Sequence, residues 1–366
     1  MKKIALIVDN LDVLLSNGKL QGGGSHVLRQ LLYYLMASKD CELDVFAGTM
    51  TLEKPDGISN VFQYRYSLYF DIVKAEEAFE PYKNNYDKVI LGYGIAPFGA
   101  TLLQAHSFAY RNQLYSCKMF SSFMKWKNRK KLEKEKKLFE RQSPIYFAMS
   151  EKIKEDYSSH FGIDKDKIVV VYPGCSLPLV ESENTNKDFV FGFAGGLNTN
   201  KGIFRFLSAF RKISRKHSEV KAIIINNKPK KAKMLNTLVS LLGLKNKVSV
   251  IDFQADMADF YSQIDVMTLP SRHEAFGLVA LEAAAYKKIP LVSNSTGFAE
   301  VAKDCYNSFV FDVTKNPVKN LSEKMVQIYN LYKNDKSKYN EIKNNAYEIA
   351  KEYTWEGFCS KIFEKL

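Results

Sequence analysis

Two glutamates, Glu274 and Glu282, stand where the chain passes from a predicted strand to a predicted helix. An apolar run at residues 266–269 predicts the strand, and polar residues that include Glu274 follow it. Apolar side chains then recur at the three-and-four spacing of a helix, at Leu278, Leu281 and Ala285. One carboxylate is therefore expected in a loop, and the other on the helix that follows it.

This arrangement suits a site for a nucleotide sugar. The start of a helix offers free N–H groups and a partial positive charge, which attract a diphosphate. Here the start of the helix is expected at Phe276, Gly277 and Leu278. Glu282, further along the helix, can accept hydrogen bonds from a ribose diol. Glu274, in the loop, can bind sugar hydroxyls near the reacting carbon.

The spacing of the two glutamates within PSRHEAFGLVALEAAA, followed by Gly297 and Glu300, resembles the signature of family 4 retaining glycosyltransferases. The resemblance implies the GT-B fold, an α/β architecture of two Rossmann-like doubly wound domains that face each other across a cleft. It also implies sugar transfer to a hydroxyl with retention of configuration. Glu274 then orients the sugar without acting as a committed nucleophile, and the leaving phosphate takes the acceptor proton on the same face.

A second motif lies in residues 195–202, between an apolar run at 189–194 and a helical pattern that starts at Ile203. The family pattern here is Gly-Arg-Leu, three variable residues and Lys-Gly. Lys201 occupies the lysine position, whereas Gly196 stands where the family has arginine. The resemblance therefore leaves Lys201 and the helix N–H groups to neutralise the diphosphate, with Arg272 as an alternative cation. Neither donor loop carries an Asp-x-Asp motif, so we expect no metal and no cofactor besides the donor.

The first half of the chain begins with a similar pattern. A predicted strand at residues 4–8, a polar loop at 9–25 and a helical pattern at 27–35 are typical of a doubly wound domain. The resemblance brings Gly22 and Gly23 of this loop close to the donor, although a plain flexible turn is the alternative. His106, in QAHSFAYR, matches a histidine near the donor sugar, and a structural role is equally open. Phe253 loosely matches the loop that holds the nucleotide base.

Further apolar runs predict strands at residues 43–46, 88–91, 101–105, 145–148, 168–171, 222–225, 248–251 and 289–292. The pattern restarts after a polar segment, which predicts an acceptor-binding domain at 1–175, a linker at 176–187 and a nucleotide-sugar domain at 188–348. A last helix at 349–366 carries Tyr353, Trp355 and Phe358, and the resemblance implies that it packs back on the first domain.

The composition limits the class of protein. The chain has 366 residues with a formal net charge of +13, which favours anionic partners. Residues 111–141 combine many lysines with aromatic side chains, and either an anionic membrane surface or a solvated helix accounts for them. No recognisable motif indicates nucleic acid. The five cysteines lack metal spacing, and the N-terminal apolar run stops at Asp9, too short for a signal peptide. We therefore expect a cytoplasmic protein. Contact with the inner face of the plasma membrane is left open.

The predicted function is retaining transfer of a sugar from a nucleotide donor to a glycan or glycolipid of a cell-surface polysaccharide or lipopolysaccharide. A UDP-sugar is expected from its frequency in the family. Two alternatives stay open. One is a nucleotide-sugar-binding regulatory or partner subunit with little turnover, to which Gly196 points. The other is a synthase or phosphorylase of soluble sugars on the same fold.

Overall fold

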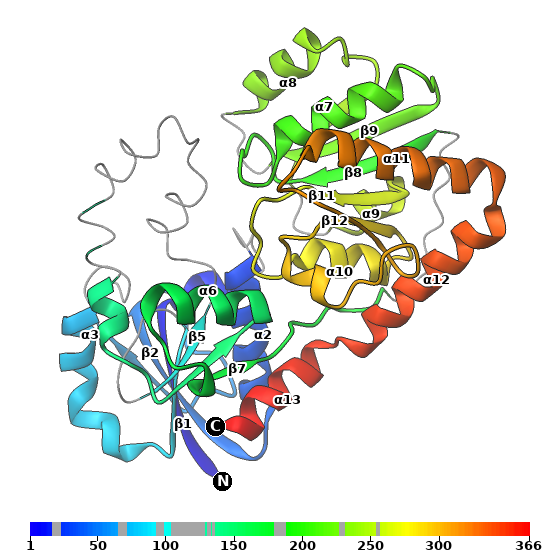
Figure 1. Cartoon of the computed structure of the whole chain (residues 1–366). Helices are drawn as coiled ribbons and strands as arrows, with labels where there is room; N and C mark the ends of the chain where they lie inside the picture. Colours follow the sequence, from blue (N-terminus) through cyan, green and yellow to red (C-terminus); the bar gives the residue numbers. More distant parts are fainter. Residues whose placement is uncertain are drawn as a thin grey trace. The chain divides into compact units, whose positions relative to one another are not determined.

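The structure is a computed structural model that describes residues 1–16, 23–64, 72–92, 99–103, 129, 133, 136–178, 188–226, 231–253 and 257–366. The chain divides into two compact units (Figure 1). Unit 1 holds residues 1–172 and 356–366, and unit 2 holds residues 173–355. The sequence-based domain boundary was drawn at residue 175, and the chain leaves unit 1 after Tyr172.

Unit 1 is built on a parallel sheet of seven strands in the order β3-β2-β1-β4-β5-β6-β7. Its strand β1 lies between β2 and β4 and has five consecutive buried residues, so an apolar run replaces the alternation of a half-exposed strand. The strands are β1 (Lys2–Asn10), β2 (Cys41–Thr49), β3 (Asn60–Gln63), β4 (Lys88–Leu91), β5 (Ala100–Leu103), β6 (Ile145–Ala148) and β7 (Ile168–Val170).

The helices of unit 1 begin earlier than the sequence indicated. The segment expected to be a polar loop contains a short helix, because Asn10 caps it by accepting from the N–H of Val13 at 2.9 Å and because Leu11 and Leu14 are buried. The helices are α1 (Leu11–Leu15), α2 (Gly23–Ala37), α3 (Ile72–Phe79), α6 (Glu151–Phe161) and α13 (Trp355–Lys365), with 3-10 turns η1 (Glu80–Asn85) and η3 (Lys165–Lys167).

Unit 2 has a parallel sheet of six strands in the order β10-β9-β8-β11-β12-β13. Strands β8 to β10 follow one another outward in one direction, and β11 to β13 do so in the other. The direction therefore reverses between β8 and β11. The strands are β8 (Phe189–Ala194), β9 (Val220–Asn226), β10 (Val248–Asp252), β11 (Val266–Leu269), β12 (Ile289–Ser293) and β13 (Phe309–Phe311).

Phenylalanines on alternate positions of β8 form the centre of the unit 2 core. Phe189, Phe191 and Phe193 are buried and lie in one cluster with Phe206 and Phe210 of α7. Their apolar surface keeps α7 against the sheet and fixes the loop that joins β8 to it. The helices of this unit are α7 (Ile203–Ser214), α8 (Ala232–Leu241), α9 (Ala258–Gln263), α10 (Leu278–Ala285), α11 (Pro317–Asn334) and α12 (Lys336–Glu352), with the 3-10 turn η5 (Gly297–Glu300).

The end of the chain is two helices, where the sequence analysis expected one. Helix α12 ends at Glu352 and α13 starts at Trp355, so Tyr353 belongs to neither. Between them the chain pairs with an earlier segment, since the N–H of Cys175 donates to the carbonyl of Tyr353 at 2.9 Å. Gly174 permits this approach, because a Cβ there would lie 2.1 Å from the carbonyl carbon of Thr354. This pairing interrupts the helical hydrogen bonds.

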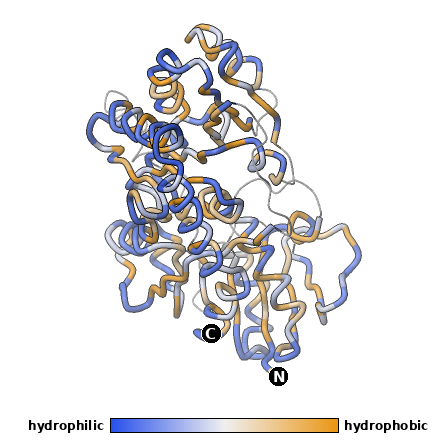
Figure 2. The backbone as a smooth tube through the Cα atoms, turned by 90° about the vertical axis from the view of Figure 1, so that its right-hand side faces the viewer, coloured by the Kyte–Doolittle hydropathy of each residue, from blue (hydrophilic) through white to orange (hydrophobic). Residues whose placement is uncertain are grey.

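None of the described helices is long and apolar enough to cross a membrane. Figure 2 shows hydrophilic and hydrophobic stretches that alternate along the chain.

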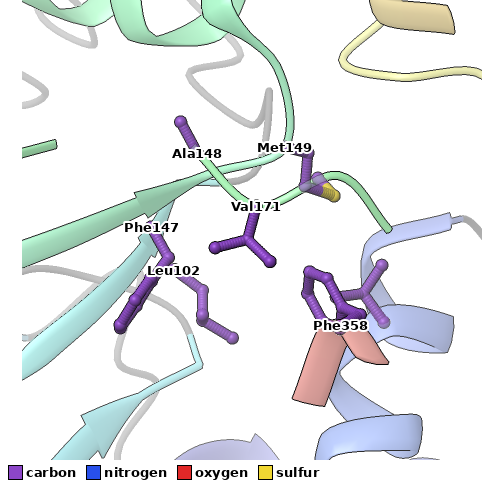
Figure 3. Close-up of a pocket in the computed structure, with 7 residues that line it drawn as sticks. Leu102, Phe147, Ala148, Met149, Val171 and Phe358 are labelled. Carbon is purple, nitrogen blue, oxygen red and sulfur yellow. The ribbon is translucent and has the colours of Figure 1, made fainter. Parts of the chain in front are cut away.

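Helix α13 is held in unit 1 by an apolar contact. Phe358 is buried and lines a small cavity with Val27 of α2, Leu102 of β5 and Phe147 of β6 (Figure 3). The remaining lining residues, Ala148, Met149 and Val171, are also apolar. A cavity without polar groups offers a water molecule no hydrogen-bond partner, so we expect it to stay dry.

We expect Phe358→Ala to lower the free energy of unfolding of unit 1 by about 3–5 kcal/mol, because it removes a buried aromatic ring beside an existing void. Urea denaturation measures the change. Lys361→Ala is the matched control, since Lys361 is exposed on the same helix, and it should change stability by no more than about 0.5 kcal/mol. A similar small effect of both variants would contradict this anchoring role.

Candidate active site

The reversal of strand order in unit 2 defines where its functional loops meet. In open parallel sheets, ligands bind beyond the carboxyl ends of the strands at the point where the order reverses. Here the loops after β8 and β11 meet at that point, because the N–H of Arg272 donates to the carbonyl of Asn200 at 2.9 Å. The side-chain amide of Asn200 also donates to the carbonyl of His273 at 3.3 Å.

The loop after β8 is tightly folded around glycines. Gly202 has a φ of +85° as the N-cap of α7, and a Cβ there would lie 2.2 Å from the carbonyl oxygen of Pro270. Asn198 holds the rest of the loop, since its Oδ1 accepts from the N–H of Asn200 at 3.0 Å and from that of Lys201 at 3.3 Å. These constraints fix the backbone position of Lys201.

Lys201 and Glu274 form an ion pair between the two loops. Both side chains are largely buried, with 29% and 16% of their surface exposed. On the other side, Glu274 is held by the loop after β12, because its N–H donates to Ser295 at 3.3 Å and its carbonyl accepts from Gly297 at 3.1 Å. The cation and the loop carboxylate identified in the sequence are thus brought together.

Helix α10 starts beside this pair. Gly277 is its N-cap with a φ of +103°, and no side chain of the described residues caps the helix there. Phe276 is buried and packs edge-on against Phe298, with ring centroids 5.9 Å apart. The ring of Phe276 is therefore held in the core, and only its backbone can contact a ligand. The backbone N–H groups of Gly277 and Leu278 lie at the start of the helix.

Glu282 lies one turn into α10 and is half-buried. The hydroxyl of Tyr261 donates to its Oε2 at 2.5 Å. Burial raises the pKa of the Glu282 carboxyl, and the hydrogen bond from Tyr261 opposes this rise. The carboxylate predicted to bind ribose thus has a defined orientation.

Arg205 is a site residue that the sequence analysis missed. Its Nε donates to the carbonyl of Pro270 at 2.9 Å and its Nη2 to that of Asn200 at 3.4 Å, so it joins the two loops. Burial and the nearby charge of Arg272 lower its pKa to about 10, which leaves it protonated at neutral pH. A lone arginine within a helical pattern is usually solvated, and no local pattern in the sequence indicated its position.

Two of the remaining predicted residues, Phe253 and Gly23, belong to other segments of the described chain. Phe253 is half-buried just after β10, where its N–H donates to the carbonyl of Asn226 at 3.1 Å. Gly23 is the first residue of α2 in unit 1. His106 and Gly22 lie outside the described residues, as does most of the basic segment at 111–141.

We expect Gly202→Ala to destabilise unit 2 more than Gly243→Ala. Both glycines have a positive φ, +85° and +71°, so both substitutions cost about 1–2 kcal/mol in backbone strain. Only at Gly202 does the new methyl group overlap with another backbone, whereas nothing lies within 4 Å at Gly243. Urea unfolding midpoints compare the two variants, and equal losses would show that the loops can separate freely.

Comparison with known proteins concerns the family and the fold of the chain. Residues 179–349 match the family "Glycosyl transferases group 1". An uncharacterized glycosyltransferase of Methanocaldococcus jannaschii is 26% identical over 208 residues, 55% of each chain. The capsular polysaccharide biosynthesis glycosyltransferase CapM of Staphylococcus aureus is 27% identical over 145 residues, 40% of this chain and 38% of its own. The chain thus spans about half the length of these curated relatives, or less.

Solved structures match over nearly the whole chain. Sucrose-phosphate synthase from Thermosynechococcus elongatus has a TM-score of 0.76 at 17% identity and covers 100% of this chain and 98% of its own. WaaG, a glycosyltransferase involved in lipopolysaccharide biosynthesis, has a TM-score of 0.72 at 14% identity, with 98% of both chains covered. With the two parallel sheets, these matches show that the chain has the GT-B fold. The family match and the fold together support the glycosyltransferase superfamily.

Proposed function

We propose that this chain, with its GT-B fold and its match to group 1 glycosyltransferases at residues 179–349, is a retaining glycosyltransferase that uses a nucleoside diphosphate sugar. One observation carries the proposal. Lys201, Glu274 and the start of α10 converge where the strand order of unit 2 reverses, with Glu282 on the same helix. This set offers a cation for phosphate and separate carboxylates for the sugar and the ribose.

The donor binds by replacing the internal ion pair. Lys201 leaves Glu274 for the diphosphate, and Glu274 then accepts hydrogen bonds from the sugar hydroxyls. Both groups keep a partner in each state, which avoids an unpaired buried charge. The start of α10 adds about half a positive charge to the phosphate site.

Two arginines at other positions supply the positive charge of the arginine that the family has at position 196. Arg205, on the first turn of α7, bonds to both loops, and Arg272 lies two residues after Pro270 in the loop after β11. Their positive charges raise the local potential at the site of the leaving group. We therefore expect full turnover without a metal or cofactor, and this argues against the alternative of a binding subunit with little activity.

The chemical step follows from the family resemblance. Charge grows on the leaving diphosphate as the glycosidic bond breaks, and Lys201 and the helix N–H groups stabilise it. The leaving phosphate oxygen accepts the proton of the acceptor hydroxyl, which attacks from the same face. Because attack and departure take place on the same face, the anomeric configuration is retained, and Glu274 orients the sugar for this step.

The acceptor is proposed from relatives and charge. CapM of S. aureus is named for capsular polysaccharide biosynthesis and WclY of Escherichia coli for O-antigen biosynthesis. We propose a glycan or glycolipid of such a cell-surface polysaccharide, reached at the inner face of the plasma membrane. UDP is the proposed nucleotide, since the structurally similar HepE of Anabaena is solved with UDP-glucose, at a TM-score of 0.70 and 17% identity.

Thermal shift against UDP, GDP and ADP tests nucleotide binding first, since a ligand at a hundred times its dissociation constant adds about 2.7 kcal/mol of stability. We expect Glu282→Ala to weaken binding of the preferred nucleotide by about 1.5–3 kcal/mol, as it removes hydrogen bonds to a charged group. Calorimetry measures the loss. A folded Glu282→Ala protein with unchanged affinity would show that the ribose is bound elsewhere.

Turnover of a radiolabelled UDP-sugar separates the roles of the paired residues. We expect Lys201→Ala to lower kcat by about a hundredfold or more, the scale for losing one preorganised group at a developing charge. Glu274→Gln should reduce turnover far more than it weakens UDP binding, because it contacts the sugar.

Lys247→Ala and Glu219→Gln are the matched controls, since Lys247 bonds to the carbonyl of Ser218 and Glu219 to Tyr329, just before β9. Both should keep normal turnover. An inverted anomeric configuration of the product, seen by NMR, would reject the retaining mechanism even if all variants behave as expected.

A further inference from the structure

Tyr261 of α9 is fixed so that its hydroxyl can point in one direction only. The residue is 1% exposed. Its ring stacks on Tyr286, with centroids 5.0 Å apart and an interplanar angle of 27°. The hydroxyl donates to Oε2 of Glu282 at 2.5 Å, a short distance typical of a hydrogen bond to a charged oxygen. A rigid aromatic side chain thus holds one oxygen of a carboxylate on the neighbouring helix.

The other carboxylate oxygen of Glu282, Oε1, accepts no hydrogen bond from the described residues. The carboxylate accepts one side-chain bond among them, from Tyr261, and this bond goes to Oε2. Glu282 is half-buried, so part of the residue is open to solvent. The hydrogen bond also counters the burial that raises the pKa of Glu282, and so favours the ionised form that accepts hydrogen bonds best.

The position of Tyr261 in the chain connects two parts of nucleotide recognition. Phe253, which is proposed to lie near the base, follows β10, and the same connection leads into α9 (Ala258–Gln263). Tyr261 then reaches from α9 to Glu282 on α10. Phe253, proposed for the base, and Tyr261, which orients the carboxylate proposed for the ribose, are thus only eight residues apart in the sequence.

We propose that Tyr261 is a positioning residue that aims Glu282 at the ribose hydroxyls, so that the enzyme selects ribonucleoside diphosphates over their 2′-deoxy counterparts. The inference rests on the proposed function. A carboxylate on a flexible side chain loses entropy when it binds a diol, and one that is already held in place loses less. Removing the hydroxyl of Tyr261 should therefore weaken binding most where both hydroxyls of the ribose diol are present.

The test compares Tyr261→Phe with wild type, using UDP and 2′-deoxy-UDP in calorimetric titrations. The substitution keeps the ring and its stacking on Tyr286. We expect the dissociation constant of UDP to rise roughly tenfold, the scale of one hydrogen bond to a charged group. That of 2′-deoxy-UDP, which keeps the 3′-hydroxyl alone, should rise by clearly less, about threefold at most. In turnover assays, KM for the donor should rise while kcat stays nearly constant, because the ribose lies away from the reacting carbon.

Tyr329→Phe is the matched control. Tyr329 also donates its hydroxyl to a glutamate, Glu219, but does so just before β9, at the opposite end of the sheet. This variant should bind both nucleotides like wild type. Tyr261→p-aminophenylalanine restores an N–H donor at the same place and should recover most of the preference for UDP.

Two results would overturn the inference while leaving the proposed function intact. One is unchanged UDP affinity in Tyr261→Phe. The other is an equal loss for UDP and 2′-deoxy-UDP, which would mean that Tyr261 only supports the fold. Wild-type protein that binds none of UDP, GDP and ADP would instead contradict the proposed function, and the inference with it.

Discussion

The ion pair between Lys201 and Glu274 depends on one constraint, the contact between neighbouring parallel strands β8 and β11. The two residues are 73 positions apart in the sequence. They meet because the loops after these parallel strands begin at the same edge of the sheet. Gly202 lets the backbones approach, and Arg205 ties them together through two carbonyl groups. The phenylalanine core under β8 and α7 supports the loop from below. A change in that core would therefore move the charged groups at the site.

An ion pair in a largely buried setting is a weak source of stability, because desolvation offsets much of the attraction between the charges. In the function proposed above, the ion pair serves binding. Each partner stays compensated while the site is empty, and each gains a replacement partner from the proposed nucleotide sugar. Glu282 is also held in place in the unbound protein, since Tyr261 donates a hydrogen bond to one of its carboxylate oxygens. The site is thus ordered in advance, which lowers the entropy lost on binding.

Much of the fold and part of the candidate site could be predicted from the sequence. Apolar runs gave the bounds of Lys88–Leu91, Phe189–Ala194 and Val266–Leu269 as the structure has them. Strands β3 and β13 were missed, because NVFQ and FVF are too short to show a period. Glu274 and Lys201 were found through the family pattern around them. Arg205 and Tyr261 were not, because an arginine on a helix and a tyrosine in an apolar segment are typical of ordinary solvated and core positions. Their roles depend on contacts across the sheet that no local pattern encodes.

A crystal structure of the protein with UDP bound tests the central claim most directly. The account predicts that the diphosphate lies between the start of α10 and the loop after β8, with Lys201 Nζ within about 4 Å of a phosphate oxygen and no longer paired with Glu274. Glu282 should contact the ribose through Oε1 while Tyr261 still holds Oε2. A diphosphate bound away from this edge of the sheet, or a bound complex in which Lys201 remains on Glu274, would contradict it.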